Sequence, residues 1–91
     1  MKNNYKLVYS KKADKQLEKF DKHISKLITK WLLKNVDCCK NPRAFGKPLK
    51  GKLSGQWRYE IGDYRILCDI QDNCIIVLAL TAGHRKEVYK N

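Results

Sequence analysis

The spacing of the apolar residues changes twice along the chain, and these changes limit the fold more than any other feature. From 11 to 36 they recur every third or fourth position, which is the period of an amphipathic helix. From 57 to 70 they recur every second position, which is the period of a strand with one buried face. A further alternating segment, NYKLVYS at 4–10, precedes the helical part. The order strand, helix, helix, strand, strand, strand (β-α-α-β-β-β) predicts an α+β fold.

The helical part divides into two helices. Ser10 is a suitable N-cap for the first helix, and a break near 21–23 separates it from the second. Helices of about 11 and 15 residues would form an antiparallel hairpin. The apolar stripe runs through Ala13, Leu17, Phe20, Ile24, Leu27, Ile28, Trp31, Leu32 and Val36. We expect the hairpin to pack on one face of a mostly antiparallel sheet and to leave the other face free to be polar.

The second half predicts three strands, at 57–61, 64–70 and 74–81. Gly-Asp and Asp-Asn pairs make the two turns between them. The run CIIVLAL at 74–80 suits a central strand covered on both faces. Residues 40–56 contain both prolines and form a loop. Nothing divides the chain, so residues 1–91 form one domain.

Composition narrows the functional classes. Twenty Lys and Arg residues against nine Asp and Glu give a net charge of +11, which attracts nucleic acid or an acidic protein. A basic but otherwise ordinary protein is the alternative. The four cysteines lack CxxC spacing, so we expect buried reduced thiols and no metal site. No secretory signal or membrane-length apolar run is present, which predicts a cytoplasmic location and no membrane partner.

Polar side chains near the C-terminal end suggest a site. Arg58 and Arg65 alternate with the apolar strand residues, so both should face away from the helices. The last strand would deliver His84, Arg85 and Lys86 to the same region, close to Tyr89. These are candidates for RNA cleavage through a ribose 2′-hydroxyl, which needs a proton acceptor, a proton donor and cations on the phosphate but no metal or other cofactor. By pattern alone, His84 is more often structural and Tyr89 more often a packing anchor.

The motifs WRYEIGDYRIL at 57–67 and GHRKEVY at 83–89 resemble the RelE/ParE superfamily of type II toxins, on the RelE side. The resemblance covers nearly the whole chain. It implies a RelE-like fold and a ribosome-dependent, metal-independent nuclease that cuts mRNA in the A site and inhibits translation. It also implies a cognate antitoxin, with operator DNA bound only through that antitoxin.

The resemblance further implies roles for individual residues. Arg65 would contact the scissile phosphate, Arg85 would stabilise the transition state, and Tyr89 would orient the substrate and take part in proton transfer. His84 is a candidate acid or base. The expected RNA-binding residues are Arg58, Lys47, Lys50, Lys52 and Lys86.

Glu60 departs from the pattern, because many relatives carry a basic residue there. This carboxylate is either a general base or a residue that weakens RNA binding. The chain ends soon after Tyr89, so the long final helix of some relatives is not expected. Two other functions stay open: a ParE-like DNA gyrase inhibitor, and an inactive relative that only binds its antitoxin.

Overall fold

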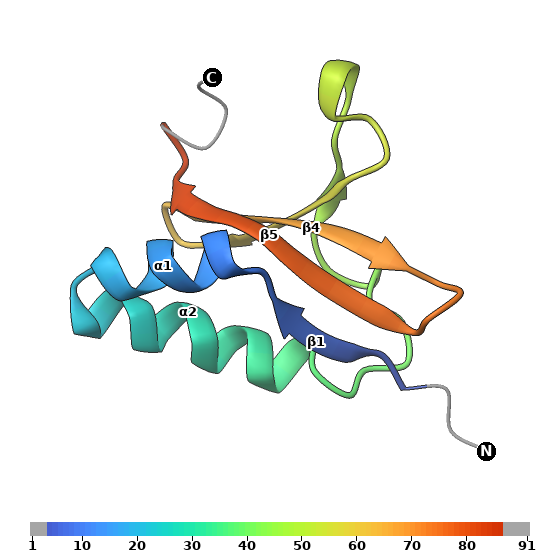
Figure 1. Cartoon of the computed structure of the whole chain (residues 1–91), viewed down its shortest axis with the longest axis horizontal. Coiled ribbons are helices and arrows are strands. Elements are labelled where there is room, and N and C mark those ends of the chain that lie inside the picture. The colour runs from blue at the N-terminus through green and yellow to red at the C-terminus, as the bar shows by residue number, and fades with distance from the viewer. Residues whose placement is uncertain (1–3, 87–91) are drawn as a thin grey trace.

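A five-stranded sheet, covered on one face by two helices, forms the body of the molecule (Figure 1). The computed structural model describes residues 4–86. The elements are β1 (Lys6–Tyr9), α1 (Lys11–Lys19), α2 (Lys22–Asn35), β2 (Lys47–Pro48), the 3-10 helix η1 (Gly51–Leu53), β3 (Trp57–Ile61), β4 (Tyr64–Gln71) and β5 (Ile76–His84). The predicted α+β order is confirmed.

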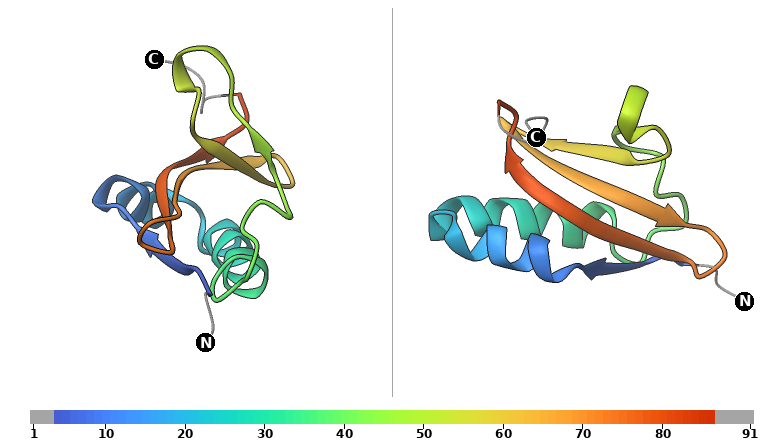
Figure 2. Two further views of the ribbon diagram at one scale, coloured as in Figure 1. Left: turned by 90° about the vertical axis from the view of Figure 1, so that its right-hand side faces the viewer. Right: turned by 45° about the horizontal axis from the view of Figure 1, so that its top comes forward.

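The strands follow the order β1-β5-β4-β3-β2 across the sheet. β1 runs parallel to β5, and every other neighbouring pair is antiparallel. The two helices connect β1 to the rest of the sheet and lie side by side beneath it (Figure 2). The sheet thus keeps one face away from the helices.

The helix hairpin begins as its sequence predicts. The Ser10 side chain accepts a hydrogen bond of 3.0 Å from the backbone N–H of Ala13, which satisfies a free donor of the first turn. α1 ends at Lys19, and α2 starts at Lys22 after a short link. No helix of the described residues is long and apolar enough to cross a membrane.

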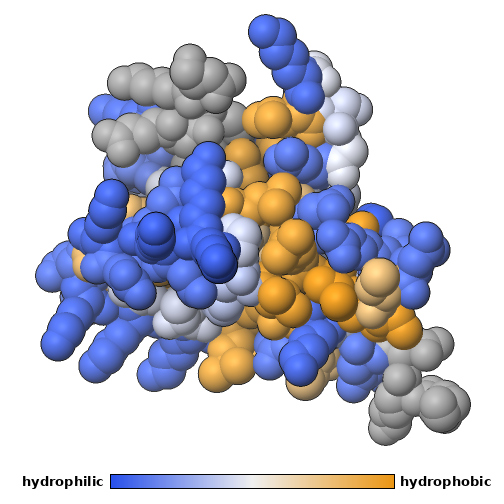
Figure 3. All heavy atoms as spheres, in the orientation of Figure 1, coloured by the Kyte–Doolittle hydropathy of each residue, from blue (hydrophilic) through white to orange (hydrophobic). Residues whose placement is uncertain are grey.

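The core lies between the hairpin and the sheet. Tyr59 and Ile66 from the sheet and Ile28 and Leu32 from α2 are fully or almost fully buried there. Trp31 packs beside Tyr59, with 5.8 Å between the ring centroids. Figure 3 shows the contrast with the outer helix surfaces, which are hydrophilic, whereas hydrophobic atoms gather over the strands.

Three predictions about the elements need correction. The loop predicted over 40–56 contains the short strand β2, which pairs with the start of β3. The last strand spans Ile76–His84 instead of 74–81, because Ile75 adopts a left-handed φ of 56° and extends the preceding turn. β5 is also less covered than predicted, since Ile76 and Leu78 on its face away from the helices stay partly exposed.

The cysteines differ from the prediction as well. All four are free thiols, but only Cys68 is buried, whereas Cys38 and Cys74 are exposed. Burial raises the pKa of the Cys68 thiol to about 12. Cys74 was predicted to be buried because it belongs to the apolar run at 74–80. The start of that run, at 74–75, instead forms part of the turn before β5.

Candidate functional site

The face of the sheet opposite the helices carries a compact charged group. Arg58 and Glu60 project from β3, and Arg65 projects from β4. They lie there because their neighbours along the strands, Tyr59 and Ile66, point into the core on the other face. We call this surface the arginine face. Arg58 and Arg65 therefore share the side of the sheet that the strand alternation predicts.

Glu60 joins the two arginines. One of its carboxylate oxygens, Oε2, lies 2.9 Å from Nε of Arg58 and 3.6 Å from Nε of Arg65. The side chains of Arg58, Arg65 and Glu60 are 23%, 14% and 36% exposed. The arginines are thus held along their length and reach solvent only in part.

The turn between β3 and β4 brings Arg85 close to this group. Nη1 of Arg65 donates a hydrogen bond of 3.3 Å to the carbonyl of Gly62. The backbone N–H of Arg85 donates to the carbonyl of the next residue, Asp63, at 2.7 Å, and its Nε lies 3.9 Å from the Asp63 carboxylate. One turn therefore contacts both arginines that the motifs single out.

His84 lies on the helix side of the sheet and not on the arginine face, which corrects the expectation that it joins the arginines. Its ring centroid is 5.5 Å from that of Tyr64, and Tyr64 in turn packs against Phe20 of the helix hairpin. Nδ1 of His84 accepts a hydrogen bond from the backbone N–H of Lys86. The side chain of Lys86 is exposed, as an RNA-binding role requires.

A β-bulge in β5 explains the position of His84. Leu67 pairs with Thr81, but the next residue of β4, Cys68, pairs with Ala79, so Leu80 is an extra residue. One extra residue reverses the alternation along the rest of the strand. The Leu80 carbonyl accepts a hydrogen bond from the Ser10 hydroxyl at 3.2 Å. The bulge is therefore fixed by the start of α1.

Two lysines of the loop line a hollow of about 590 Å³ beside Arg58. Lys47 pairs with Arg58 across β2 and β3, and Lys50 lines the same hollow. Lys52 is exposed on η1, which stands away from the sheet (Figure 1). Lys47 and Lys50 thus lie next to the arginine face. Tyr89 lies outside the described residues.

A small apolar cluster, which the sequence did not suggest, fixes this loop. Leu49 and Leu67 are buried against each other, with Leu53 packed beside them. Gly46 adopts a left-handed φ of 81°, and a Cβ there would lie 2.2 Å from the carbonyl oxygen of Arg58. The signal in the sequence was Leu67, an apolar residue on the otherwise polar side of its strand.

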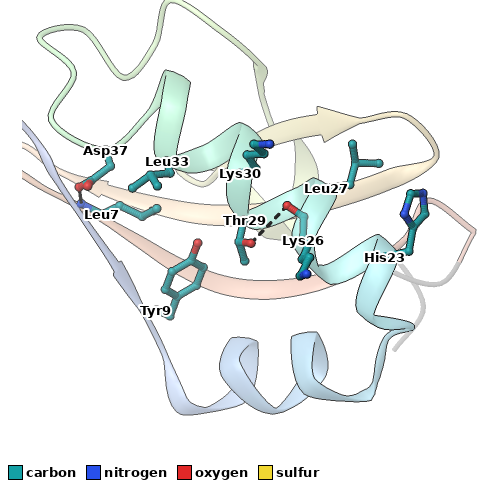
Figure 4. A pocket seen from close by; sticks show the side chains of 9 residues that line it. All are labelled: Leu7, Tyr9, His23, Lys26, Leu27, Thr29, Lys30, Leu33 and Asp37. Carbon is teal, nitrogen blue, oxygen red and sulfur yellow. Dashed lines mark hydrogen bonds between the residues drawn. The ribbon is translucent and has the colours of Figure 1, made fainter.

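A second hollow, of about 710 Å³, lies between β1 and α2 (Figure 4). Tyr9 points from β1 toward the helix, and burial raises its pKa to about 12. The hollow is lined by Leu7, Tyr9, His23, Lys26, Leu27, Thr29, Lys30, Leu33 and Asp37. Leu27 and Leu33 are exposed, although the sequence placed Leu27 in the apolar stripe. We call this hollow the β1–α2 groove.

The opposite end of the sheet carries a separate ion pair. The Arg43 guanidinium contacts both carboxylate oxygens of Asp72 at 3.1 Å, and the Tyr5 hydroxyl donates to the same carboxylate. Arg43 first, and then Tyr5, hold the pKa of Asp72 below its usual value. This exposed pair provides a useful reference for the arginine face. Within residues 4–86, no group of three or more His, Cys, Asp or Glu side chains is placed to hold a metal ion.

Comparison with known sequences finds toxins. A sequence model described as "ParE toxin of type II toxin-antitoxin system, parDE" matches residues 7–89. Toxin RelG of Mycobacterium tuberculosis is 35% identical over 54 residues, which make up 59% of this chain and 62% of that toxin. The match thus spans less than two thirds of the relative's length.

Solved structures share the architecture. The toxin–antitoxin complex RelBE2 of Mycobacterium tuberculosis contains a chain with a TM-score of 0.81 and 26% identity, covering 92% of this chain and 94% of that one. The isolated E. coli RelE toxin has a TM-score of 0.70 and 22% identity, with 93% and 90% covered. The YoeB/ParE toxin from Agrobacterium tumefaciens has a TM-score of 0.67 and 20% identity, with 87% and 96% covered. The last two likenesses concern the fold.

Proposed function

We propose that this chain, which belongs to the RelE/ParE superfamily of type II toxins, is a ribosome-dependent endonuclease that cuts messenger RNA in the A site. One observation carries the proposal: Arg58, Arg65 and Arg85 gather with Glu60 around one face and one turn of the sheet. Guanidinium groups bind phosphate through paired donors, and clustered cations stabilise the charge that develops during phosphodiester cleavage.

In the proposed reaction, the ribose 2′-oxygen attacks the adjacent phosphorus, and the bond to the 5′-oxygen breaks. Arg65 and Arg85 neutralise the phosphorane between these events. Glu60 accepts the 2′-hydroxyl proton, since its carboxylate is the one that contacts both Arg58 and Arg65 among the residues that the structure describes. We assign the proton for the leaving 5′-oxygen to Tyr89, because His84, the other candidate from the sequence, lies on the helix side of the sheet. The products are a 2′,3′-cyclic phosphate and a 5′-hydroxyl end.

The lysines account for the ribosome in this proposal. Lys47 and Lys50 are exposed beside the arginine face, and Lys52 is exposed on η1, in a chain of net charge +11. Contacts to ribosomal RNA phosphates would hold the toxin while the arginines engage the message. The cytoplasm, where translation takes place, is the location that this function requires.

Primer extension on an mRNA in a purified translation system tests the proposal. We expect cuts inside A-site codons with the wild-type protein, no cuts without ribosomes, and no cuts with Arg65→Ala. The matched control is Arg43→Ala, because Arg43 also pairs with a carboxylate but lies at the other end of the sheet. Intact mRNA with the wild-type protein, or full cleavage by Arg65→Ala, would contradict the proposal.

DNA gyrase inhibition is the second candidate function, because the matching family model is named for ParE. Such an inhibitor would lower DNA supercoiling by purified gyrase and leave mRNA intact. Arg65→Ala would then have no effect on cleavage, because there would be none to lose. The third candidate, an inactive relative, would give neither effect while still binding its antitoxin.

The partner that we propose for the β1–α2 groove is the cognate antitoxin. The apolar floor of the groove, with the exposed Lys26 and Lys30 at its side, complements an amphipathic segment with acidic flanks. Operator DNA would be bound by the antitoxin and not by this chain. Leu33, which is 64% exposed, should be central to the contact.

Co-purification with the antitoxin encoded in the same operon tests this surface. Leu33→Glu should lose the complex and keep the melting temperature of the free toxin. Lys34→Glu is the control, since the neighbouring residue does not line the groove. Equal recovery of the complex with both variants would place the antitoxin elsewhere.

A further inference from the structure

We propose that Glu60 is a built-in competitor for RNA phosphate, which occupies Arg58 and Arg65 until a phosphodiester displaces it. This inference rests on the proposed function and adds a control on substrate choice to it. Glu60 would make the arginine face bind RNA that is free in solution weakly, and bind RNA that the ribosome holds in place well.

The backbone enforces the contact. Glu60 and Arg65 are directly paired across β3 and β4, so their side chains leave the sheet next to each other. Arg58 stands two residues before Glu60 on the same strand and therefore on the same face. Two independent rules of strand geometry thus bring the carboxylate between the two guanidinium groups.

The guanidinium groups that Glu60 pairs with are those a phosphate would need. Arg65 commits Nη1 to the carbonyls of Gly62 and Tyr64, both at 3.3 Å, and turns Nε toward Glu60. Arg58 also turns Nε toward the same oxygen, at 2.9 Å. Carboxylate and phosphate are both counter-ions of a guanidinium group, so they compete for the place beside these two arginines.

The competition by Glu60 would favour mRNA that is held in the ribosome over free RNA. A free RNA must displace Glu60 using only its own phosphates, and the carboxylate also repels it. A message held in the ribosome meets the arginines at a high effective concentration, because the lysine contacts have already placed the toxin. Displacement would also release Glu60 for the 2′-hydroxyl proton, which couples binding to chemistry.

Binding of an RNA oligonucleotide with 2′-O-methyl sugars tests the inference without cleavage. Compared with the wild-type protein, Glu60→Gln should bind about tenfold more tightly at low salt, because a neutral amide replaces the carboxylate that pairs with Arg58 and Arg65. The dependence of log K on log salt should steepen by about 0.7, which corresponds to one more phosphate contact on a single strand. Binding by Glu60→Gln should be tighter while cleavage on ribosomes falls.

Glu18→Gln is the matched control. It makes the same change of charge and shape on α1, beneath the opposite face of the sheet. Its affinity for the oligonucleotide should stay within about twofold of the wild type, since only the long-range field changes. In an Arg58→Ala background the gain from Glu60→Gln should shrink, because one of the two arginines that Glu60 pairs with is missing. Glu60→Ala serves as a second variant if Glu60→Gln folds poorly.

The outcomes separate this inference from the proposed function. If the wild type cuts A-site mRNA and Glu60→Gln binds RNA no better than Glu18→Gln, the competitor role is overturned and the nuclease stands. Weaker binding by both Glu60 variants would overturn it too, because Glu60 would then support the RNA contact. If the wild type does not cut mRNA, and neither the wild type nor any variant binds the oligonucleotide, both proposals are overturned.

Discussion

The two faces of the sheet are built from different interactions. The helix face holds the largest fully buried side chains, among them Tyr59, Ile28 and Leu32, in one continuous core. The arginine face holds Arg58, Arg65 and Glu60 in ion pairs that stay partly exposed. Burial of each large apolar side chain stabilises the fold by about 1.5–3 kcal/mol, whereas a partly exposed ion pair contributes about 0–1 kcal/mol.

This difference separates stability from function. Residues of the helix face can be judged by the free energy of unfolding, because they contact no candidate substrate. Residues of the arginine face can change with little loss of stability, so their effect on activity can be measured in a folded protein. The following predictions test this separation, in order of decreasing effect on stability.

Leu32→Ala should lower the free energy of unfolding by about 3 kcal/mol, because it opens a cavity at a site with no exposed surface. Leu33→Ala, at the next position, should cost about 0.5 kcal/mol or less, since Leu33 is 64% exposed. Urea unfolding followed by circular dichroism measures both. Equal costs would show that α2 packs with a different side toward the sheet.

Gly46→Ala should lower the free energy of unfolding by about 2 kcal/mol. Residue 46 adopts a left-handed conformation, and a Cβ there would collide with the backbone of Arg58. Gly55→Ala is the control. It also has a positive φ but meets nothing within 4 Å, so it should cost about 1 kcal/mol. The melting temperatures report the difference, and identical values would argue against the close approach of the loop to β3.

Raising the pH should destabilise the protein through Tyr9. Burial raises its pKa in the folded state to about 12, so the folded protein holds the neutral phenol more strongly than the unfolded chain does. This contribution is complete below about pH 10, where the unfolded phenol titrates, and is lost as the pH rises toward 12. After allowance for its partial exposure, we expect about 1 kcal/mol.

Urea unfolding at about pH 9 and about pH 11.5, on the two sides of the titration of the unfolded phenol, measures this loss. Tyr9→Phe is the control, because it keeps the ring and removes the titrating group. The variant should lose less stability over this range than the wild type. Equal losses would assign the alkaline destabilisation to other groups, such as Tyr59, whose pKa burial also raises.

Arg65→Ala should abolish toxicity and lower the free energy of unfolding by only about 0.5–1 kcal/mol, because its ion pair and its bonds to carbonyl oxygens are partly solvated. Arg43→Ala should cost about 0.5 kcal/mol or less and leave growth arrest unchanged. Growth after induction and thermal melts are the measurements. A large loss of stability with Arg65→Ala would show that the arginine face also supports the fold.

The fold was predictable from the sequence to the extent that it depends on apolar period. The changes of spacing after Ser10 and before Trp57 gave the helices and the antiparallel hairpins, and the motifs gave the toxin superfamily, which the family match confirms. β2 was not predictable, because a strand of two residues has no period to detect. Its position depends on Gly46 and on the pairing with Arg58, which are contacts made only in the folded chain.

The candidate site was predictable where alternation is regular. It placed Arg58 and Arg65 on one face, and the structure agrees. Alternation was not enough for His84, because the bulge at Leu80 comes before it and leaves no mark in the sequence. The exposure of Leu27 and Leu33 was also hidden, since a helical stripe does not reveal how wide a surface the sheet covers.

The extra residue at Leu80 has a consequence for how such a chain can change. Each substitution in β5 alters one side chain and leaves its neighbours facing as before. Removal of Leu80 alone would keep the pairs Leu67–Thr81 and Cys68–Ala79 and leave the later side chains of β5 on their present faces, whereas closing the bulge with every residue kept would turn His84 toward the arginines. The presence of the bulge, and not only the residue type at each position, therefore decides which ionisable group β5 presents on the arginine face.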